Sequence, residues 1–308
     1  MALEALISIV IPAYNYAALL PRAINSVTAQ MGEQHELIVV DDGSTDDTQA
    51  VLGRLKKELQ CSFEFFYKEN GGLASTRNFA ISKSNGKYLV FLDADDELAP
   101  EALSLLEQHI KSNPDTRMVI GGHTSISDNG RKRSHIPSDL PSSPFERVQD
   151  YLINKKISLS NGACAMHCDI FTRGLYPEKF RSVEDIPVFA QALAHYPCST
   201  LQHPLALIHK HNDSLRHQFN HAKEIGLDLV DEVFSSQRFG SEFQTLKKDF
   251  YVRRCLSLFR SAYLAGDSEM AKKYFKKALR SNWRILLKGS YLRKALKVWA
   301  GNTYVKKS

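Results

Sequence analysis

The chain has 308 residues, of which 43% are hydrophobic and 24% are charged, so it can form one α/β domain together with a smaller helical one. No apolar run approaches the ~20 residues that a membrane-spanning helix needs, and the N-terminus lacks the basic region and apolar core of a secretory signal. Five scattered cysteines fit the reducing cytosol. We therefore expect a cytoplasmic globular protein.

The net charge of +6 conceals an uneven distribution. Residues 271–308 contain twelve Lys or Arg and no Asp or Glu, whereas residues 1–270 contain 28 basic and 34 acidic residues. The sequence thus predicts a mildly acidic body that carries a strongly basic C-terminal tail.

Short β-branched runs alternate with helix-like segments through residues 6–121. We predict strands at 6–11, 36–40, 63–67, 87–92 and 117–121, and helices at 20–30, 46–59, from 71 onward and at 100–111. Ser44 or Thr45 is the expected N-cap of the second helix. This alternation predicts an α/β fold with a mostly parallel, doubly wound sheet and right-handed crossovers.

The second half of the chain is less regular. We expect a polar loop or hairpin at 125–144, a helix at 145–154, a pocket-lining segment of small residues at 160–166, a helix starting at 181 and a strand at 200–209. Further helices are predicted at 221–237, 241–264, 268–281 and 284–300. We therefore divide the chain into an α/β domain, residues 1–218, and a C-terminal helical region, residues 219–308.

Polar side chains collect where the predicted strands end. Tyr14 and Asn15 follow the first strand, Asp41 and Asp42 the second, and the run Asp93-Ala94-Asp95-Asp96 the fourth. Doubly wound sheets bind ligands outside the carboxyl ends of their strands, and a divalent cation with a phosphorylated ligand would balance the three carboxylates of that run. Taken singly, such carboxylates are often solvated caps, but their collection on one rim favours a binding site.

Five motifs along the chain carry a family resemblance. They are SIVIPAYN at 8–15, VVDDGSTD at 39–46, GGLASTRN at 71–78, FLDADD at 91–96 and VED at 183–185. In this order they resemble the family 2 glycosyltransferases of the GT-A fold, over residues 5–215. The C-terminal helices are also similar to those that trail this domain in many bacterial cell-envelope members.

The resemblance implies transfer of a sugar from a nucleotide-diphosphate sugar, with a UDP-sugar favoured, to an acceptor hydroxyl. The residues that it implies for nucleotide-sugar binding are Pro12, Ala13, Tyr14, Asn15, Asp41, Asp42, Ser44, Arg77, Asp93 and Ala94. Asp95, Asp93 and His211 are implied as ligands of Mn²⁺ or Mg²⁺. Asp185 matches the family's general base, with Glu184 beside it.

Such a reaction needs these parts. The nucleotide diphosphate leaves as an anion that a divalent cation stabilises, and a carboxylate that accepts the hydroxyl proton contributes roughly 10²- to 10⁴-fold. We predict a single displacement that inverts the anomeric configuration. Plainer roles stay open for the same residues: Glu184 and Asp185 can be ordinary acids of a helix N-terminus, Arg77 a surface ion-pair partner, and Tyr14 a residue packed beneath the sheet.

Other groups of potential metal ligands fit known metal sites less well. Asp46 and Asp47 are more typical of helix caps than of ligands. The histidines between 209 and 221 match no common metal-binding spacing, and Cys164, His167 and Cys168 lack a second ligand pair at zinc-like spacing.

Residues 283–300 interleave apolar and aromatic side chains with basic ones. One interpretation is an amphipathic segment that docks on the anionic cytoplasmic leaflet, next to a lipid-linked acceptor. The alternative is a helix packed on the body with its charges in solvent. Nucleic-acid binding is not expected, because no recognised motif accompanies the charge.

The leading hypothesis is an inverting, metal-dependent glycosyltransferase that builds lipopolysaccharide, capsule, exopolysaccharide or another surface glycan. It would work in the cytoplasm, with peripheral contact to the inner membrane. The alternatives are a polyprenyl-phosphate glycosyltransferase and a non-catalytic protein that binds nucleotide-sugars or docks on membranes.

Overall fold

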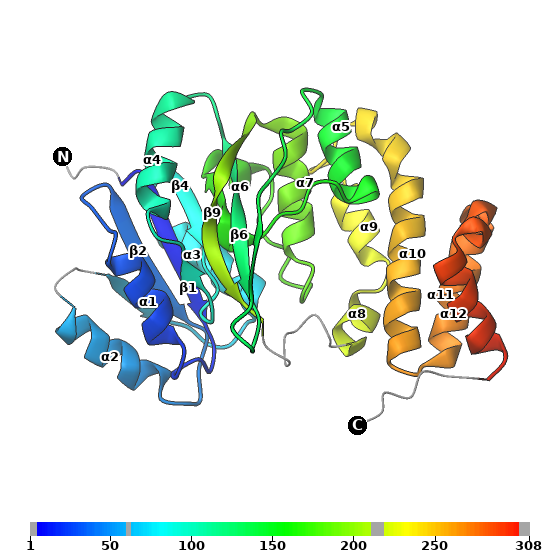
Figure 1. Cartoon of the computed structure of the whole chain (residues 1–308), viewed down its shortest axis with the longest axis horizontal. Helices are drawn as coiled ribbons and strands as arrows, with labels where there is room; N and C mark the ends of the chain where they lie inside the picture. The colour runs from blue at the N-terminus through cyan, green and yellow to red at the C-terminus, as the bar shows by residue number, and fades with distance from the viewer. Residues whose placement is uncertain (1–4, 60–62, 211–218, 302–308) are drawn as a thin grey trace.

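The computed structural model describes residues 5–59, 63–210 and 219–301. Its centre is a nine-stranded sheet in the order β3-β2-β1-β4-β8-β6-β9-β5, with β7 paired to β6. The strands are β1 (Ile7–Ala13), β2 (His35–Asp41), β3 (Glu64–Tyr67), β4 (Tyr88–Phe91), β5 (Glu97–Leu98), β6 (Met118–Ile126), β7 (Lys132–His135), β8 (Cys164–His167) and β9 (Cys198–His209). Helices cover both faces of this sheet (Figure 1).

The helices alternate with the strands in the first half and dominate the end of the chain. They are α1 (Leu20–Thr28), α2 (Thr48–Glu58), α3 (Leu73–Lys83), α4 (Ala102–Ser112), α5 (Pro144–Gln149), α6 (Asp169–Arg173), α7 (Asp185–His195), α8 (Phe219–Ile225), α9 (Asp228–Val233), α10 (Lys247–Leu264), α11 (Ser268–Ser281) and α12 (Gly289–Trp299). Figure 1 places α2 and α12 at opposite ends of the long axis.

The first four strands of the sheet path, β3, β2, β1 and β4, are parallel. Every residue of β1 is buried, as expected for a parallel strand covered by helices on both faces. On one face α1, α2 and α4 pack on Ile7, Ile9 and Ile11 of β1. On the other face Val10 of the same strand belongs to the apolar cluster formed with α3, α6 and α7. Alternate side chains of β1 therefore contribute to two separate apolar layers, one on each face of the sheet.

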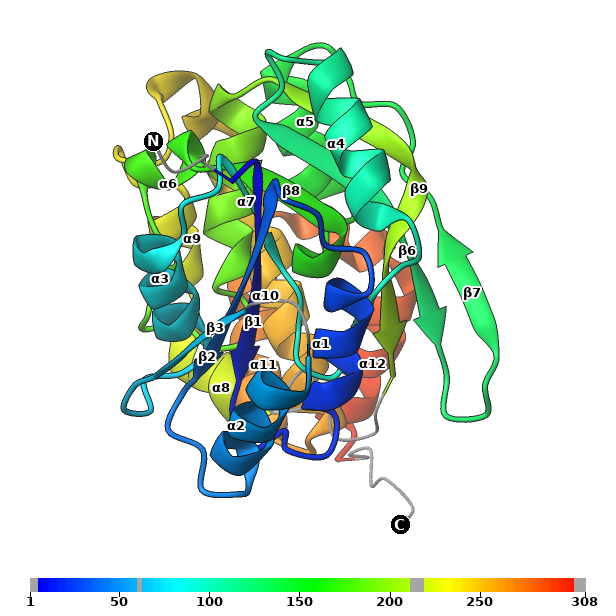
Figure 2. The same cartoon turned by 90° about the vertical axis from the view of Figure 1, so that its left-hand side faces the viewer.

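The second half of the sheet is mixed. β8 lies antiparallel between β4 and β6, β9 is parallel to β6, and β5 and β7 are antiparallel edge pairings. The β6–β7 hairpin, predicted as a loop or hairpin, projects from the side of the molecule (Figure 2). The pocket-lining role expected for residues 160–166 is wrong for its last three residues, because Cys164, Ala165 and Met166 form part of buried strand β8 in the sheet.

The C-terminal helices pack in two ways. Residues of α9 and the start of α10, such as Val233 and Phe250, join the apolar cluster that covers one face of the sheet. The rest of α10 packs with α11 and α12 in a cluster of its own. The predicted boundary at residue 218 falls outside the described ranges, so the two-domain division stays a prediction.

Several predicted helices are interrupted. The single helix predicted at 221–237 is replaced by the end of α8 and by α9. The helices predicted to begin at 241 and 284 are preceded by 3₁₀ turns, Ser241–Leu246 before α10 and Trp283–Leu287 before α12. The predicted helix at 145–154 ends in a π-helical turn, Asp150–Asn154. Within the part of the chain that the structure describes, no helix has both the length and the apolar character to cross a membrane.

Candidate active site

The loops after β1 and β2 are joined at the carboxyl edge of the sheet. Asn15 adopts a left-handed conformation (φ 58°), its N–H donates to Ser44 Oγ at 2.9 Å, and its Oδ1 accepts from the Thr45 N–H at 2.7 Å. Asp46 Oδ2 accepts from the Ala17 N–H at 3.0 Å. The side chains of Asn15 and Ser44, expected to bind the nucleotide-sugar, therefore first hold the two loops together.

The expected cap of α2 is wrong. Neither Ser44 nor Thr45 caps this helix. Asp46 Oδ1 accepts from the Thr48 N–H at 3.0 Å and also from the hydroxyl of Thr48. These bonds lower the pKa of Asp46, although its partial burial opposes the shift. Asp46 is thus a capping group, the role that its sequence position favoured over metal binding.

The two aspartates at the end of β2 are both buried but differ in their partners. Asp42 Oδ1 lies 2.6 Å from Lys68 Nζ, and its two oxygens accept the N–H groups of residues 71 and 72 at 3.0 and 2.8 Å. Asp41 Oδ1 accepts from the Ser44 N–H at 2.9 Å, but its Oδ2 is buried without a partner among the described residues. Asp41 therefore keeps a free acceptor, whereas both oxygens of Asp42 are engaged.

The other residues expected around the base present little side-chain surface. Pro12, Ala13 and Ala94 are buried, so their side chains offer little surface to a ligand. Tyr14 is different, because 45% of its surface is exposed beside the end of β1. The phenol ring of Tyr14 is therefore open to a ligand, and it does not pack beneath the sheet.

Three carboxylates cluster where β4 ends. Asp93 is half-exposed, whereas Asp96 is buried and accepts from the His209 N–H at 2.8 Å. Burial raises the pKa of Asp96 to about 8, and the charges of Asp93 and Asp95 act in the same direction. Burial and the two neighbouring carboxylates thus both favour the protonated form of Asp96.

Two residues outside the quoted motifs, Tyr16 and Arg22, face the same cluster. Burial, followed by the charges of Asp95 and Asp93, raises the pKa of the Tyr16 hydroxyl to about 12. The Arg22 guanidinium donates to the backbone carbonyl of Asp95 and lies 3.6 Å from Glu97. Tyr16 directly follows a quoted motif, but its orientation toward Asp95 depends on the loop conformation, which the residue pattern does not reveal.

Arg77 connects this cluster with the second half of the chain. Its side chain is 2% exposed, and it donates to Glu184 Oε1 at 2.9 Å and to Asp93 Oδ1 at 3.1 Å. Its guanidinium also stacks over the Tyr176 ring, 5.3 Å from the centroid. Burial by itself would lower the pKa of Arg77, but the charges of Asp93 and Glu184 together raise this pKa above its usual range. The exposed ion pair considered from sequence is thus replaced by a buried bridge.

Asp185 begins α7 directly after the residue that Arg77 holds. Burial raises the pKa of Asp185 to about 6, the charge of Glu184 adds to the rise, and Arg77 opposes it. Asp93 also raises this pKa, which is consistent with the two carboxylates belonging to one site. Asp185 is therefore a carboxylate whose protonation changes near neutral pH, while Glu184 is a fixed partner of Arg77.

The residues present fit a divalent cation at the end of β4. Mg²⁺ and Mn²⁺ take oxygen ligands, and Asp93 and Asp95 supply carboxylates on a short loop that follows a buried strand. Burial is the main cause of the raised pKa of Asp96, and the charges of Asp93 and Asp95 add to it, so three carboxyl groups share this short loop. His211, the third expected ligand, lies outside the described residues.

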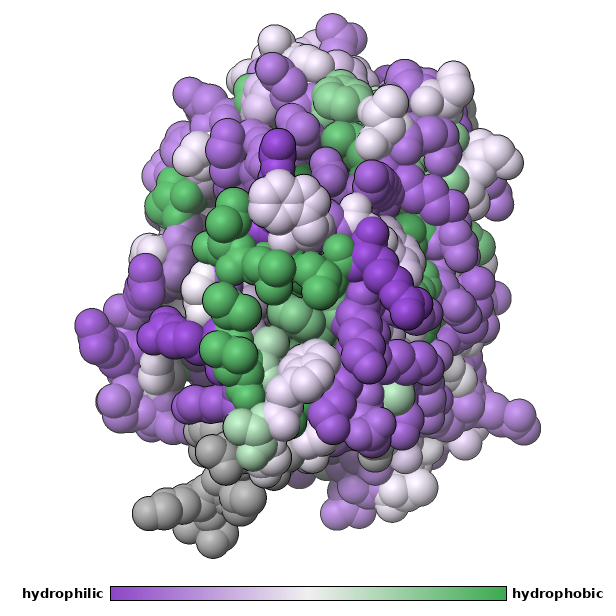
Figure 3. All heavy atoms as spheres, turned by 90° about the vertical axis from the view of Figure 1, so that its right-hand side faces the viewer, coloured by the Kyte–Doolittle hydropathy of each residue, from purple (hydrophilic) through white to green (hydrophobic). Residues whose placement is uncertain are grey.

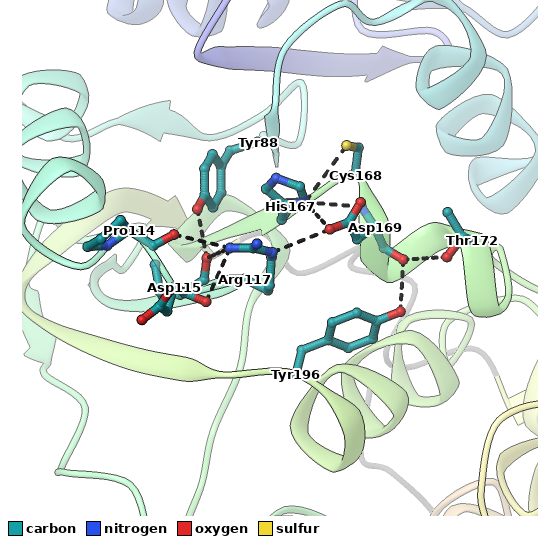
Figure 4. Close-up of polar contacts among 10 residues, drawn as sticks. Tyr88, Pro114, Asp115, Arg117, His167, Cys168, Asp169, Thr172 and Tyr196 are labelled. Atoms are coloured by element: carbon teal, nitrogen blue, oxygen red, sulfur yellow. Dashed lines mark hydrogen bonds and ion pairs between the residues drawn. The ribbon is translucent and has the colours of Figure 1, made fainter.

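A second group of potential ligands lies near the start of β4, whereas the carboxylate cluster follows the end of that strand. Figure 4 shows the contacts within this second group. His167 pairs with Tyr88 at the start of β4, and the ligand atoms of His167, Cys168 and Asp169 lie within 4.8 Å of one another. However, His167 Nδ1 accepts from the Asp169 N–H at 3.2 Å, and Arg117 Nε donates to Asp169 Oδ2 at 3.3 Å. These bonds engage His167 and Asp169 in holding the start of α6, which is a structural role.

The fold is that of the GT-A glycosyltransferases, which confirms the predicted fold class. S. aureus TarS 1–349, crystallised with UDP, is similar with a TM-score of 0.57 at 17% identity, covering 97% of this chain and 93% of that one. The mannosyltransferase PcManGT from Pyrobaculum calidifontis, in complex with GDP-Man and Mn²⁺, gives 0.58 at 16% identity, covering 96% and 86%. At such identities the likeness concerns the fold alone.

The sequence profile of Glycosyl transferase family 2 matches residues 8–176. This is more than half of the chain, which therefore belongs to that family. An uncharacterized glycosyltransferase of Rickettsia bellii (strain RML369-C) is 32% identical over 182 residues, 59% of this chain. A GalNAc(5)-diNAcBac-PP-undecaprenol β-1,3-glucosyltransferase of Campylobacter jejuni subsp. jejuni serotype O:2 is 36% identical over 117 residues, 37% of each chain. The match spans only 25% of the length of the Rickettsia relative.

Proposed function

We propose that this protein is an inverting, metal-dependent glycosyltransferase that moves a sugar from a nucleotide-diphosphate sugar to an acceptor hydroxyl. The observation that carries the proposal is the Arg77 bridge, because it joins the carboxylate cluster after β4 to the Glu184–Asp185 pair. The carboxylates that would hold a cation and diphosphate, and the carboxylate whose pKa is about 6, then belong to one active site on a GT-A fold.

The base of the donor would be recognised at the end of β2. Asp41 Oδ2 is a buried acceptor without a partner among the residues described. An imino N–H donor such as N3–H of uracil or N1–H of guanine would satisfy it once the loops around it open to admit the base. The exposed ring of Tyr14 offers a stacking surface beside it. We favour a UDP-sugar, and TarS, a neighbour of the same fold, has been crystallised with UDP and with UDP-GlcNAc.

Asp95 and Asp93 would hold Mn²⁺ or Mg²⁺ against the diphosphate. The cation, when bound, neutralises the negative charge that develops on the leaving nucleotide diphosphate. PcManGT binds Mn²⁺ together with GDP-Man. The protein's own contribution here is to fix the carboxylates at the end of a rigid, buried strand, where their repulsion favours a cation.

Asp185 would act as the general base. The acceptor hydroxyl attacks the anomeric carbon, the hydroxyl proton passes to the Asp185 carboxylate, and the bond to the diphosphate breaks with its electron pair leaving on the phosphate oxygen. A single displacement of this kind inverts the anomeric configuration. A pKa of about 6 leaves Asp185 largely ionised at neutral pH yet basic enough to accept the proton.

The acceptor is proposed to belong to a bacterial surface glycan, such as lipopolysaccharide, capsule or exopolysaccharide. The Campylobacter relative, whose name describes a glucosyltransferase acting on an undecaprenol-linked glycan, supports this choice.

The test is a thermal-shift panel of nucleotide-sugars with and without Mn²⁺, followed by an assay of donor hydrolysis without acceptor. We expect a metal-dependent rise in Tm with one UDP- or GDP-sugar, lost in Asp95→Ala and retained in Asp115→Ala, an exposed residue at the opposite edge of the sheet. Binding without hydrolysis would favour a non-catalytic nucleotide-sugar-binding protein. No shift with any nucleotide-sugar would refute the proposal.

A further inference from the structure

The last helix carries two adjacent apolar stripes, and only one of them is packed. Tyr291, Ala295 and Val298, spaced i, i+4 and i+7, face the cluster formed with α10 and α11, and Ala295 and Val298 are buried. Leu292, Leu296 and Trp299, one position further along, form the second stripe. Leu296 is 62% exposed. Trp299 is still 45% exposed although its ring packs edge-on against Phe275, with the ring centroids 5.7 Å apart. Packing on the body therefore leaves much of this stripe in solvent.

The 3₁₀ turn before α12 continues the exposed stripe. Ile285 is buried and anchors the turn, whereas Trp283, Leu286 and Leu287 are 64%, 39% and 76% exposed. Residues 283–299 thus contribute five of the eleven exposed large hydrophobic side chains found among the residues that the structure describes. Figure 3 shows apolar side chains gathered into one patch on the face where α11 and α12 lie. We call these five side chains the C-terminal patch.

Cations surround the C-terminal patch. Arg284, Lys288, Arg293 and Lys297 are exposed, and none of them pairs with an acidic residue among the described ranges. No Asp or Glu occurs from residue 271 to the end of the sequence. In Figure 3 hydrophilic side chains border the apolar patch. The face therefore combines exposed tryptophan and leucine with unbalanced positive charge.

We propose that the C-terminal patch docks this protein on an anionic lipid bilayer, with α12 lying in the interface. Tryptophan and leucine enter the boundary between headgroups and acyl chains, while Lys and Arg reach anionic headgroups. Each cation near such a surface adds to the attraction. An isologous contact with a second copy fits the charges less well, because it would place the same cations against one another. The docking goes beyond the proposed transfer reaction and does not depend on it.

Docking would have a consequence for the proposed reaction. A protein held on a bilayer meets a lipid-linked acceptor at a high effective concentration without any added contact to the acceptor itself. The packed stripe holds α12 on α10 and α11, so the helix is already formed before it meets lipid. Less ordering entropy is then lost on binding than for an unfolded tail.

The experiment is co-sedimentation of the full chain with vesicles of phosphatidylcholine alone or mixed with phosphatidylglycerol. We expect binding to the mixed vesicles that weakens as salt is raised. Leu287→Ser with Leu296→Ser should lower the partition coefficient about tenfold. Lys288→Glu, Arg293→Glu and Lys297→Glu together should lower it about a hundredfold. All these side chains are exposed, so circular dichroism and Tm should be unchanged.

Matched variants elsewhere on the surface are the controls. Ile136→Ser with Leu175→Ser changes two exposed apolar side chains, and Lys57→Glu, Lys132→Glu and Lys248→Glu reverse three exposed charges. Both sets should bind vesicles as the wild type does. The proposal is overturned by absence of binding to the mixed vesicles, or by equal losses in test and control variants. A dimer in sedimentation equilibrium that the two leucine substitutions abolish, without vesicle binding, would assign the patch to self-association instead. Donor hydrolysis should stay at the wild-type level in every variant, which separates this test from that of the transfer reaction.

Discussion

Arg77 and Glu184 should shift the pH dependence of the reaction in opposite directions. Both act on Asp185: Glu184 raises its pKa and Arg77 lowers it. Because a general base must be ionised, the rate should rise with pH through the Asp185 pKa of about 6. Glu184→Gln removes a negative neighbour, so the acid limb should move to lower pH. Arg77→Met removes a positive neighbour, so the acid limb should move to higher pH.

The same substitutions should differ in stability. Arg77→Met leaves Glu184, which is 4% exposed, without its cation and with both carboxylate oxygens unpaired, since Oε2 has no partner among the described residues. Loss of one partner of a buried pair costs about 3–5 kcal/mol of unfolding free energy. Glu184→Gln keeps a hydrogen-bond acceptor, and Arg77 keeps Asp93, so we expect a loss of about 1–3 kcal/mol. The double variant should lose less unfolding free energy than the two single variants together, because it leaves no unpaired buried charge at this position.

The assay is donor hydrolysis or transfer measured from pH 5 to 9 at saturating metal, together with urea unfolding of each variant. Asp185→Asn should lower the rate roughly 10²- to 10⁴-fold, and the pH profile of this variant should lack the acid limb. If Arg77→Met and Glu184→Gln moved the acid limb in the same direction, or left it in place, Asp185 would not be the titrating base. Additive losses of unfolding free energy would contradict the buried bridge.

Four further positions can be tested singly. Asp41→Asn should weaken nucleotide binding about tenfold by placing a donor against the imino N–H of the base. Asp42→Asn should instead lower the unfolding free energy by about 3 kcal/mol, because Asp42 is buried and Lys68 would lose its charge partner. Calorimetric titration and urea unfolding distinguish the two variants, and an exchange of the two outcomes would refute the assignment. Gly86→Ala should cost about 3 kcal/mol, because its Cβ would lie 2.5 Å from the backbone N of Ser8, and a loss below about 1 kcal/mol in urea unfolding would contradict that contact. Cys168→Ser should leave unfolding free energy within about 0.5 kcal/mol and donor hydrolysis unchanged, and loss of metal-dependent activity would contradict the structural role of its cluster.

The sheet could be predicted from sequence because its strands are short, β-branched and bounded by turn residues. All of β1 is buried on both faces, so its apolar run needs no alternation to be recognised. The predictions that failed concern elements whose conformation depends on tertiary packing. β8 contains alanine, cysteine and methionine, which have no strong strand preference, and it is a strand because β4 and β6 flank it. The C-terminal segments predicted as long helices start with 3₁₀ turns for which periodicity gives no signal.

The positions of the site residues followed from a topological rule, but their roles did not. Strand ends meet at one edge of a parallel sheet, so Asp41 and Asp93 could be placed together without coordinates. Which carboxylate keeps a free oxygen is decided by backbone N–H groups of distant loops, and this left Asp41 open while Asp42 became the anchor of residues 71 and 72. Two adjacent aspartates thus differ in their partners. Both oxygens of Asp42 are engaged, whereas Asp41 keeps one unpaired oxygen, for which we propose nucleotide binding.

Arg77 extends the same argument from one strand end to the whole site. It is 107 residues from Glu184 along the chain. The sequence suggested a nucleotide-sugar contact or a surface ion pair for Arg77, and it gave no indication of a buried bridge. Its burial follows from the packing of α3 and α7 on the same face of the sheet as Tyr176. A buried cation must be balanced where it lies, and Arg77 is balanced by Asp93 from the first half of the chain and by Glu184 from the second. Because Arg77 holds Glu184 there, Asp185 lies next to it at the site. Replacing Arg77 with lysine should therefore leave the charge but lose one of the two carboxylate contacts, because a single ammonium does not reproduce the planar fork that spans Glu184 and Asp93.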